Sequence, residues 1–147
     1  MMVRFGYMSW LDEQIARREE LKIRAALLDE HAPKVYADLW ECIVKIIEEA
    51  KDKLPDARFF PNGSPKERHV LVSFIREGTP DRSMTLKLFP DGRKISAFFN
   101  LSEMIFEVGI CKDGVVCLKR EGNPVSGLDA AHMILGPFLF PELSIEQ

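Results

Sequence analysis

The sequence predicts an α+β fold with two N-terminal helices, a five-stranded antiparallel meander sheet and a short C-terminal helix. Three observations predict this fold. Apolar residues recur with the helical period in the first third of the chain, and with the alternating period of a strand after Asn62-Gly63-Ser64-Pro65. Short connections rich in Gly, Pro and Asp then separate the alternating segments. Such connections are typical of antiparallel neighbours.

Two amphipathic segments are predicted to form the N-terminal helices. Ser9 followed by Asp12 resembles a capping box, and the helix it starts is predicted to run to about Glu30. Pro33 suits the first position of a second helix, because its missing N–H costs nothing there. This second helix is predicted to end near Lys53, and its wide apolar face favours packing across a sheet.

Five strands are predicted, over residues 68–76, 83–89, 94–99, 104–111 and 115–121. Their register is chosen to keep one face of the sheet apolar. The predicted pairs are Leu88–Ile95, Leu86–Ala97, Met84–Phe99, Ala97–Phe106, Ile95–Val108, Val108–Leu118, Ile110–Val116, Val72–Leu86 and Phe74–Met84. The last hairpin then needs a three-residue loop with Gly114 in the left-handed conformation.

The end of the chain is predicted to form a short third helix. Ser126 and Asp129 provide its cap, and Gly136-Pro137 is expected to stop it. The apolar tail that follows, Phe138-Leu139-Phe140, is expected to dock rather than remain free. It could fold over the second face of the sheet or reach a partner chain.

The second face of the sheet carries the candidate functional residues. In this register Ser96 lies between Lys87 and Glu107, and Glu107 lies directly opposite Lys119. The apolar members of the same face are Leu71, Phe89, Phe98 and Ile105. An apolar centre with a polar rim is typical of protein interfaces.

Two classes of function fit this face. The first is a non-catalytic protein-binding or assembly module, acting as a homodimer or as an adaptor for another protein. The second is a small enzyme or small-ligand binder, in which Lys87, Ser96 and Glu107 transfer protons. We favour the first class, because no oxyanion hole or enclosed pocket is apparent beside the polar row.

Other classes of function have less support. The three histidines, His31, His69 and His132, lie far apart, and neither metal-ligand spacing nor a phosphate-binding glycine loop is present. We therefore predict no metal and no cofactor. Residues 58–94 carry eight Lys and Arg against four Asp and Glu, which is too sparse to favour nucleic acid.

The composition is that of an ordinary globular domain. The chain has 147 residues, 46% hydrophobic and 29% charged, which predicts one domain over 1–147 with a possible flexible arm at 1–8. Apolar runs are short, so we expect no membrane span. Three unpaired-looking cysteines favour a cytoplasmic location. Cys111 and Cys117 are expected to lie diagonally across a hairpin, ~7–8 Å apart and too distant for an unstrained disulfide.

Overall fold

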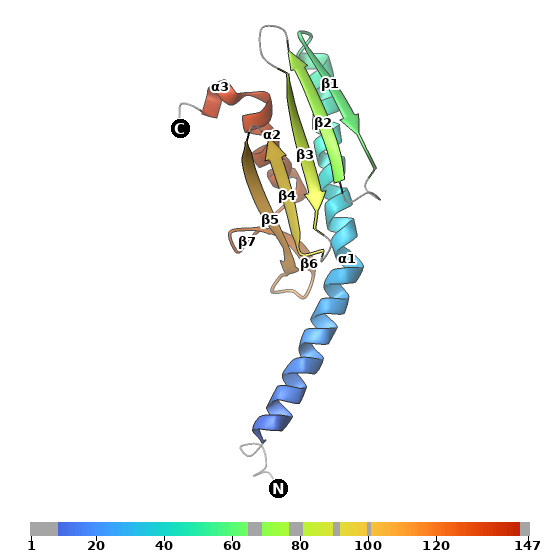
Figure 1. The fold of residues 1–147 in the computed structure, drawn as a ribbon, viewed down its shortest axis with the longest axis vertical. Helices are drawn as coiled ribbons and strands as arrows, with labels where there is room; N and C mark the ends of the chain where they lie inside the picture. Colours follow the sequence, from blue (N-terminus) through green and yellow to red (C-terminus); the bar gives the residue numbers. More distant parts are fainter. Residues whose placement is uncertain (1–8, 65–68, 77–80, 90–91, 100, 145–147) are drawn as a thin grey trace.

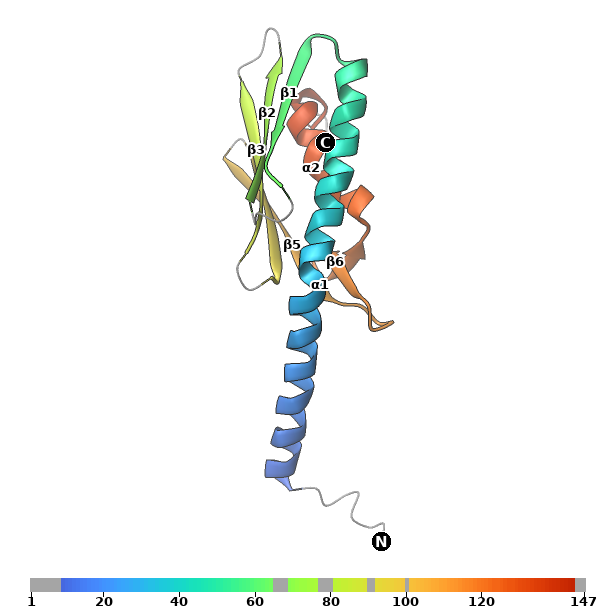
Figure 2. The ribbon, with the colours of Figure 1, turned by 90° about the vertical axis from the view of Figure 1, so that its right-hand side faces the viewer.

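The computed structural model describes residues 9–64, 69–76, 81–89, 92–99 and 101–144. The α+β fold is confirmed, with an antiparallel sheet in one layer and two helices, α1 (Trp10–Lys53) and α2 (Gly127–Leu139), in the other (Figure 2). The sheet is a meander of seven strands in chain order. They are β1 (Ala57–Asn62), β2 (His69–Arg76), β3 (Arg82–Leu88), β4 (Lys94–Phe99), β5 (Ser102–Ile110), β6 (Val116–Arg120) and β7 (Asn123–Val125). A four-residue helix, α3 (Pro141–Ser144), follows α2.

The two predicted N-terminal helices are a single helix, α1, of 44 residues with Pro33 inside it (Figure 1). Pro33 has no N–H to donate to the carbonyl one turn earlier. Burial of Leu28, Ala32 and Tyr36 around it offsets that loss and holds the helix together. The predicted cap is confirmed, because the Ser9 hydroxyl accepts a hydrogen bond from the Asp12 N–H at 3.1 Å.

Helix α2 also continues through a proline. Its cap is as predicted, with the Asp129 N–H donating to the Ser126 hydroxyl at 3.0 Å. The helix then passes Gly136-Pro137 and ends at Leu139. The predicted stop at Gly136-Pro137 is wrong because two more residues, Phe138 and Leu139, are buried in the core by extending the helix.

The core lies between the sheet and α1. Ile43 and Ile47 are fully buried, whereas Ile46 is only partly buried. Tyr36 is also fully buried, and its hydroxyl donates to the Leu86 carbonyl of β3 at 3.0 Å. This hydrogen bond fixes α1 against the middle of the sheet.

Helix α2 completes the core from the same side. The Phe138 ring lies 5.6 Å from the ring of Phe74 in β2 and 5.9 Å from that of Phe99 in β4, measured between ring centroids. The apolar tail therefore docks on the helical side of the sheet. The alternative in which the tail folds over the second face is wrong, because the Phe138 side chain fills the core instead.

The register is partly as predicted. The β3–β4 and β5–β6 pairs are confirmed, and Gly114 has the expected positive φ of 81°. Strands β4 and β5 are shifted by two residues, with Ile95 opposite Phe106, and β2 and β3 are shifted likewise, with Val72 opposite Met84. A shift of two leaves every side chain on its predicted face.

A tight turn sets the β4–β5 register. Phe99 pairs directly with Ser102, so only two residues separate the strands, and Leu101 has a positive φ of 63°. Two-residue hairpin loops need such left-handed residues. The apolar pattern alone had favoured a longer loop, because it does not distinguish registers that differ by two.

Strands β1 and β7 were not predicted. They extend the meander at its two edges, and each contains a proline, Pro61 in β1 and Pro124 in β7. Proline is tolerated at a sheet edge because no ladder hydrogen bond is lost on the solvent side. Both strands were missed because a proline within a short segment argues against a strand.

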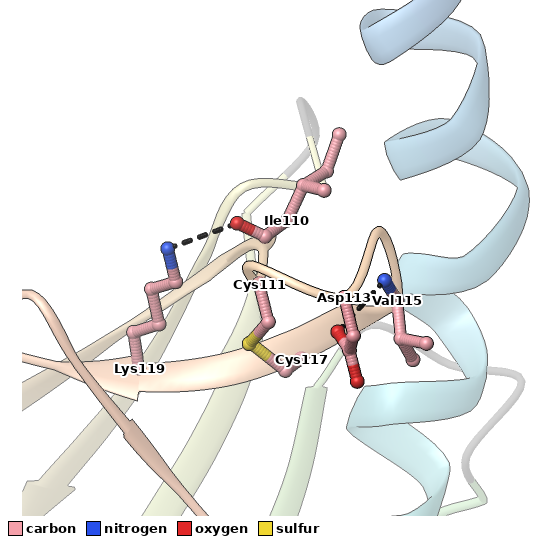
Figure 3. Close-up of a disulfide and its surroundings, with 6 residues drawn as sticks. All are labelled: Ile110, Cys111, Asp113, Val115, Cys117 and Lys119. Atoms are coloured by element: carbon pink, nitrogen blue, oxygen red, sulfur yellow. Dashed lines mark hydrogen bonds between the residues drawn. A yellow bond between two sulfur atoms is a disulfide. The ribbon is translucent and has the colours of Figure 1, made fainter.

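Cys111 and Cys117 form a disulfide across the β5–β6 hairpin (Figure 3). The prediction that they are too far apart is wrong. Regular pairing stops at Ile110–Val116, and Cys111 begins the turn with its N–H donating to the Val115 carbonyl at 2.9 Å. The turn brings the two Cα atoms to 6.2 Å, which is within disulfide range.

Candidate functional site

The second face of the sheet, which lies opposite the helices, is not covered by any other part of the described chain. Both α1 and α2 lie on the other side (Figure 2), and no described segment returns over this face. Phe98, at its centre, is 46% exposed. We call this surface the open face.

The polar row is only partly assembled on the open face. Lys87 lies directly opposite Ser96, as predicted. Ser96 is followed in the row by Ile105 rather than Glu107, because β5 is shifted by two residues. Ser96 is 4% exposed, and its hydroxyl donates to the Glu103 carboxylate at 2.8 Å. Glu103, which the predicted register had left outside the strand, is thus the acidic neighbour of Ser96.

Glu107 lies in a different row, between two lysines. It pairs with Lys94 of β4 and, as predicted, with Lys119 of β6. The Lys119 ammonium donates to the Ile110 carbonyl at 3.1 Å (Figure 3). No ion pair with Glu107 is found within the described chain, so its exposed carboxylate faces solvent.

Apolar side chains form the centre of the open face. Leu71, Thr85 and Phe98 lie side by side on β2, β3 and β4. Phe60 of β1 and Ile105 of β5 lie on the same face and are exposed and half-buried, respectively. We call Phe60, Leu71, Phe98 and Ile105 the open-face patch.

The sequence analysis predicted Phe89 on this face but missed Phe60. Phe89 was predicted on this face, but it is half-buried just after β3, with the Lys87 ammonium 5.7 Å from its ring centroid. Phe60 was missed because β1 was missed. Its signal was the alternation of buried Ala57 and Phe59 with exposed Arg58 and Phe60.

Three hollows on the described surface lie elsewhere. The largest, about 910 Å³, lies between α1 and the β5–β6 hairpin, where Arg24, Cys111 and Lys119 contribute to its wall. A second lies beside α2 and α3, and a third lies between α1 and Gly114. None of the three is lined by Lys87, Ser96 or Glu107.

The described residues include no group of three His, Cys, Asp or Glu side chains arranged to hold a metal ion. Within the same part of the chain, no helix has both the length and the apolarity to span a membrane. Comparison of the chain with known protein families, with curated proteins and with solved structures finds no match.

Proposed function

We propose that this chain is a non-catalytic binding or assembly module that pairs with a second copy of itself through the open face. The observation that supports this proposal most strongly is the open-face patch. It places two pairs of large apolar side chains, Phe60 with Leu71 and Phe98 with Ile105, on a surface that the described helices leave uncovered, with Thr85 between the pairs. Exposed apolar patches larger than a few hundred Å² are uncommon on monomers and mark contact sites.

The edges of the sheet favour pairing through its face. An exposed edge strand recruits other strands through its unpaired N–H and C=O groups. The edge strand β1 contains Pro61, and β7 has three residues, of which Pro124 is one. Prolines and short edge strands discourage edge-to-edge addition. These edge features do not hinder association through the open face of the sheet.

The charges around the patch suit a twofold arrangement. Lys87 on β3 lies to one side of Phe98, and Glu103 on β5 lies directly opposite Phe98 on the other, whereas Glu107 is flanked by Lys94 and Lys119. A twofold axis near Phe98 and parallel to the strands would place Lys87 of one copy on the side of Glu103 of the other. Self-complementary surfaces of this kind are what an isologous dimer requires.

A catalytic role for Lys87, Ser96 and Glu107 has less support. Ser96 and Glu107 lie in different rows, and the Ser96 hydroxyl is nearly buried against Glu103. None of the three hollows described above is lined by any of these three residues. No observation therefore favours the enzyme hypothesis over the binding hypothesis.

Sedimentation equilibrium of wild type and Phe98→Glu tests the proposal. We expect a wild-type dimer at micromolar concentration, and a Phe98→Glu dimer at least ~30-fold weaker, as for a central interface residue. The reason is that a carboxylate would enter a desolvated contact without a partner. Phe98 is 46% exposed and pairs directly with Glu103 of β5, so the new glutamate should also lower the thermal stability slightly through like-charge repulsion. Circular dichroism checks that the variant stays folded.

Leu128→Glu is the matched control. Leu128 is exposed to a similar extent, but it lies in the first turn of α2, in the helical layer. This variant should dimerise as the wild type does. A monomeric wild type would contradict the proposal, and so would equal dimerisation by Phe98→Glu and Leu128→Glu.

A further inference from the structure

The N-terminal part of α1 projects beyond the sheet (Figures 1 and 2). From Ser9 to Arg24 every residue is exposed except Gln14, which is half-buried. Leu28 is the first buried residue of the helix. An isolated helix of this length is marginal in water, because helices in proteins gain most of their stability from packing. We call residues 10–24 the projecting segment, and none of them is buried by the rest of the described chain.

The projecting segment nevertheless carries an apolar stripe. Leu21 lies two turns before Leu28, and Trp10 lies about three turns before Leu21, so all three point to the same side of the helix. Trp10 is 73% exposed and Leu21 is 62% exposed, whereas Leu28 is buried. The stripe that packs on the sheet therefore continues beyond the edge of the sheet.

Charge is segregated around the same segment. The four cations lie within the stripe or along its edges, and the four acids lie on the remaining surface of the helix. The cations are Arg17, Arg18, Lys22 and Arg24, and the acids are Asp12, Glu13, Glu19 and Glu20. Two ion pairs join the groups, Lys22–Glu19 at 3.5 Å and Arg24–Glu20 at 3.9 Å. Exposed pairs of this kind hold the charges only weakly.

This pattern selects among possible occupants. A second copy would bring Arg18 and Lys22 of both chains to one contact, where like charges repel. An anionic membrane extends past both edges of the stripe, so it would face the four acids as well as the four cations and gain no net electrostatic attraction, whereas a helix can contact the stripe alone. A protein helix with an apolar seam flanked by acids would match both the stripe and its cations.

We propose that the projecting segment of α1 docks, through Trp10, Leu11, Ile15 and Leu21, onto an acidic amphipathic helix of another protein. Leu11 and Ile15 lie between Trp10 and Leu21 along the helix axis. Both are exposed on the side of the helix that carries Arg18, so they can contribute to the same contact. Arg18 and Lys22 would pair with the acids of the partner. This surface is distinct from the open face, so the chain would hold a copy of itself with the sheet and a different protein with the helix.

A synthetic helix serves as the probe. Its sequence has leucine at the a and d positions of each heptad and glutamate at e and g, and a matched control peptide has lysine at e and g. Binding to the full chain is measured by fluorescence anisotropy of the labelled peptide. We expect saturable binding of the glutamate peptide and at least ~10-fold weaker binding of the lysine peptide, because only the former complements Arg18 and Lys22.

Two variants on opposite sides of the helix locate the contact. Leu21→Glu should weaken binding of the glutamate peptide at least ~10-fold, since it places a like charge in the apolar contact. Ile23→Glu is the control, because Ile23 is 70% exposed but lies on the acidic side of the helix. It should bind the peptide as the wild type does. Circular dichroism checks whether both variants retain the helical content of the wild type.

Four outcomes would overturn this inference. They are failure of the wild type to bind the glutamate peptide, equal binding of the two peptides, equal losses in Leu21→Glu and Ile23→Glu, and tighter binding to phosphatidylserine vesicles than to the peptide. Phe98→Glu separates this inference from the dimer proposal. It should bind the peptide normally, because Phe98 lies on the sheet and not on α1.

Discussion

The two parts of α1 carry the same apolar stripe in different surroundings. Over residues 28–50 the stripe is buried against the sheet and α2, whereas over residues 10–24 it faces solvent. Trp10 and Leu21 lie in phase with Leu28, so the apolar period continues through both parts. The two parts differ in whether another element of the protein packs against the helix. A hydrophobic stripe becomes core only where another element covers it.

The two parts of α1 also differ in the charged residues on the stripe side of the helix. In the projecting segment Arg18 and Lys22 lie on the stripe side of the helix, and both are exposed. The buried part of the stripe has apolar residues and the hydrogen-bonded Tyr36 instead. Charges among apolar residues are typical of a surface that is solvated when free and paired when bound.

The largest expected effect concerns truncation in the two parts of α1. Ile43→Ala should lower the free energy of unfolding by ~2–5 kcal/mol, because it removes a fully buried side chain. Leu21→Ala should change it by no more than about 0.5 kcal/mol, since Leu21 is exposed. Urea unfolding of both variants measures the difference. Similar losses would mean that Leu21 is covered within the free protein, which would contradict the comparison.

The next effect concerns the hairpin beside the point where α1 leaves the sheet. Replacing Cys111 and Cys117 with serine should destabilise the protein by about 2 kcal/mol, because the disulfide restricts a short loop in the unfolded chain. Thiol titration should find one reactive cysteine, Cys42, in unfolded wild type and three after reduction. Three thiols without reductant would contradict the disulfide.

The smallest expected effect is on the pKa of Glu49, near the C-terminal end of α1. The Lys53 ammonium donates a hydrogen bond to the Glu49 carboxylate at 2.8 Å and lowers the pKa of that carboxyl. A lowered pKa stabilises the folded state above the unfolded pKa, and this contribution is lost as the pH falls through the folded pKa. Lys53→Met should therefore raise the pKa of Glu49, measured by NMR titration of its carboxyl carbon. An unchanged pKa would mean that the pair does not form in solution.

Local signals in the sequence predicted much of the fold. Both helix caps, the face of every predicted strand and the left-handed Gly114 follow from short spacings, and each agrees with the structure. Side-chain alternation also placed Phe98 and Leu71 on the open face. These features depend on a few neighbouring residues, so the sequence alone determines them.

Long-range features could not be predicted in the same way. Pro33 and Pro137 looked like helix boundaries, because the burial that outweighs their cost depends on distant partners. Registers that differ by two residues keep the same apolar face, so the pattern did not separate Glu103 from Glu107 as the neighbour of Ser96. The turn at Leu101 decided between them.

Amide hydrogen exchange along α1 tests the central claim most directly, namely that one stripe is core in one part of the helix and a docking surface in the other. In the free wild-type chain, amides of residues 10–24 should exchange rapidly and those of residues 32–50 slowly, because local opening is easy where packing is absent. Adding the glutamate peptide should slow exchange in residues 10–24. Equal protection of both parts in the free chain, or no added protection from the peptide, would contradict the account.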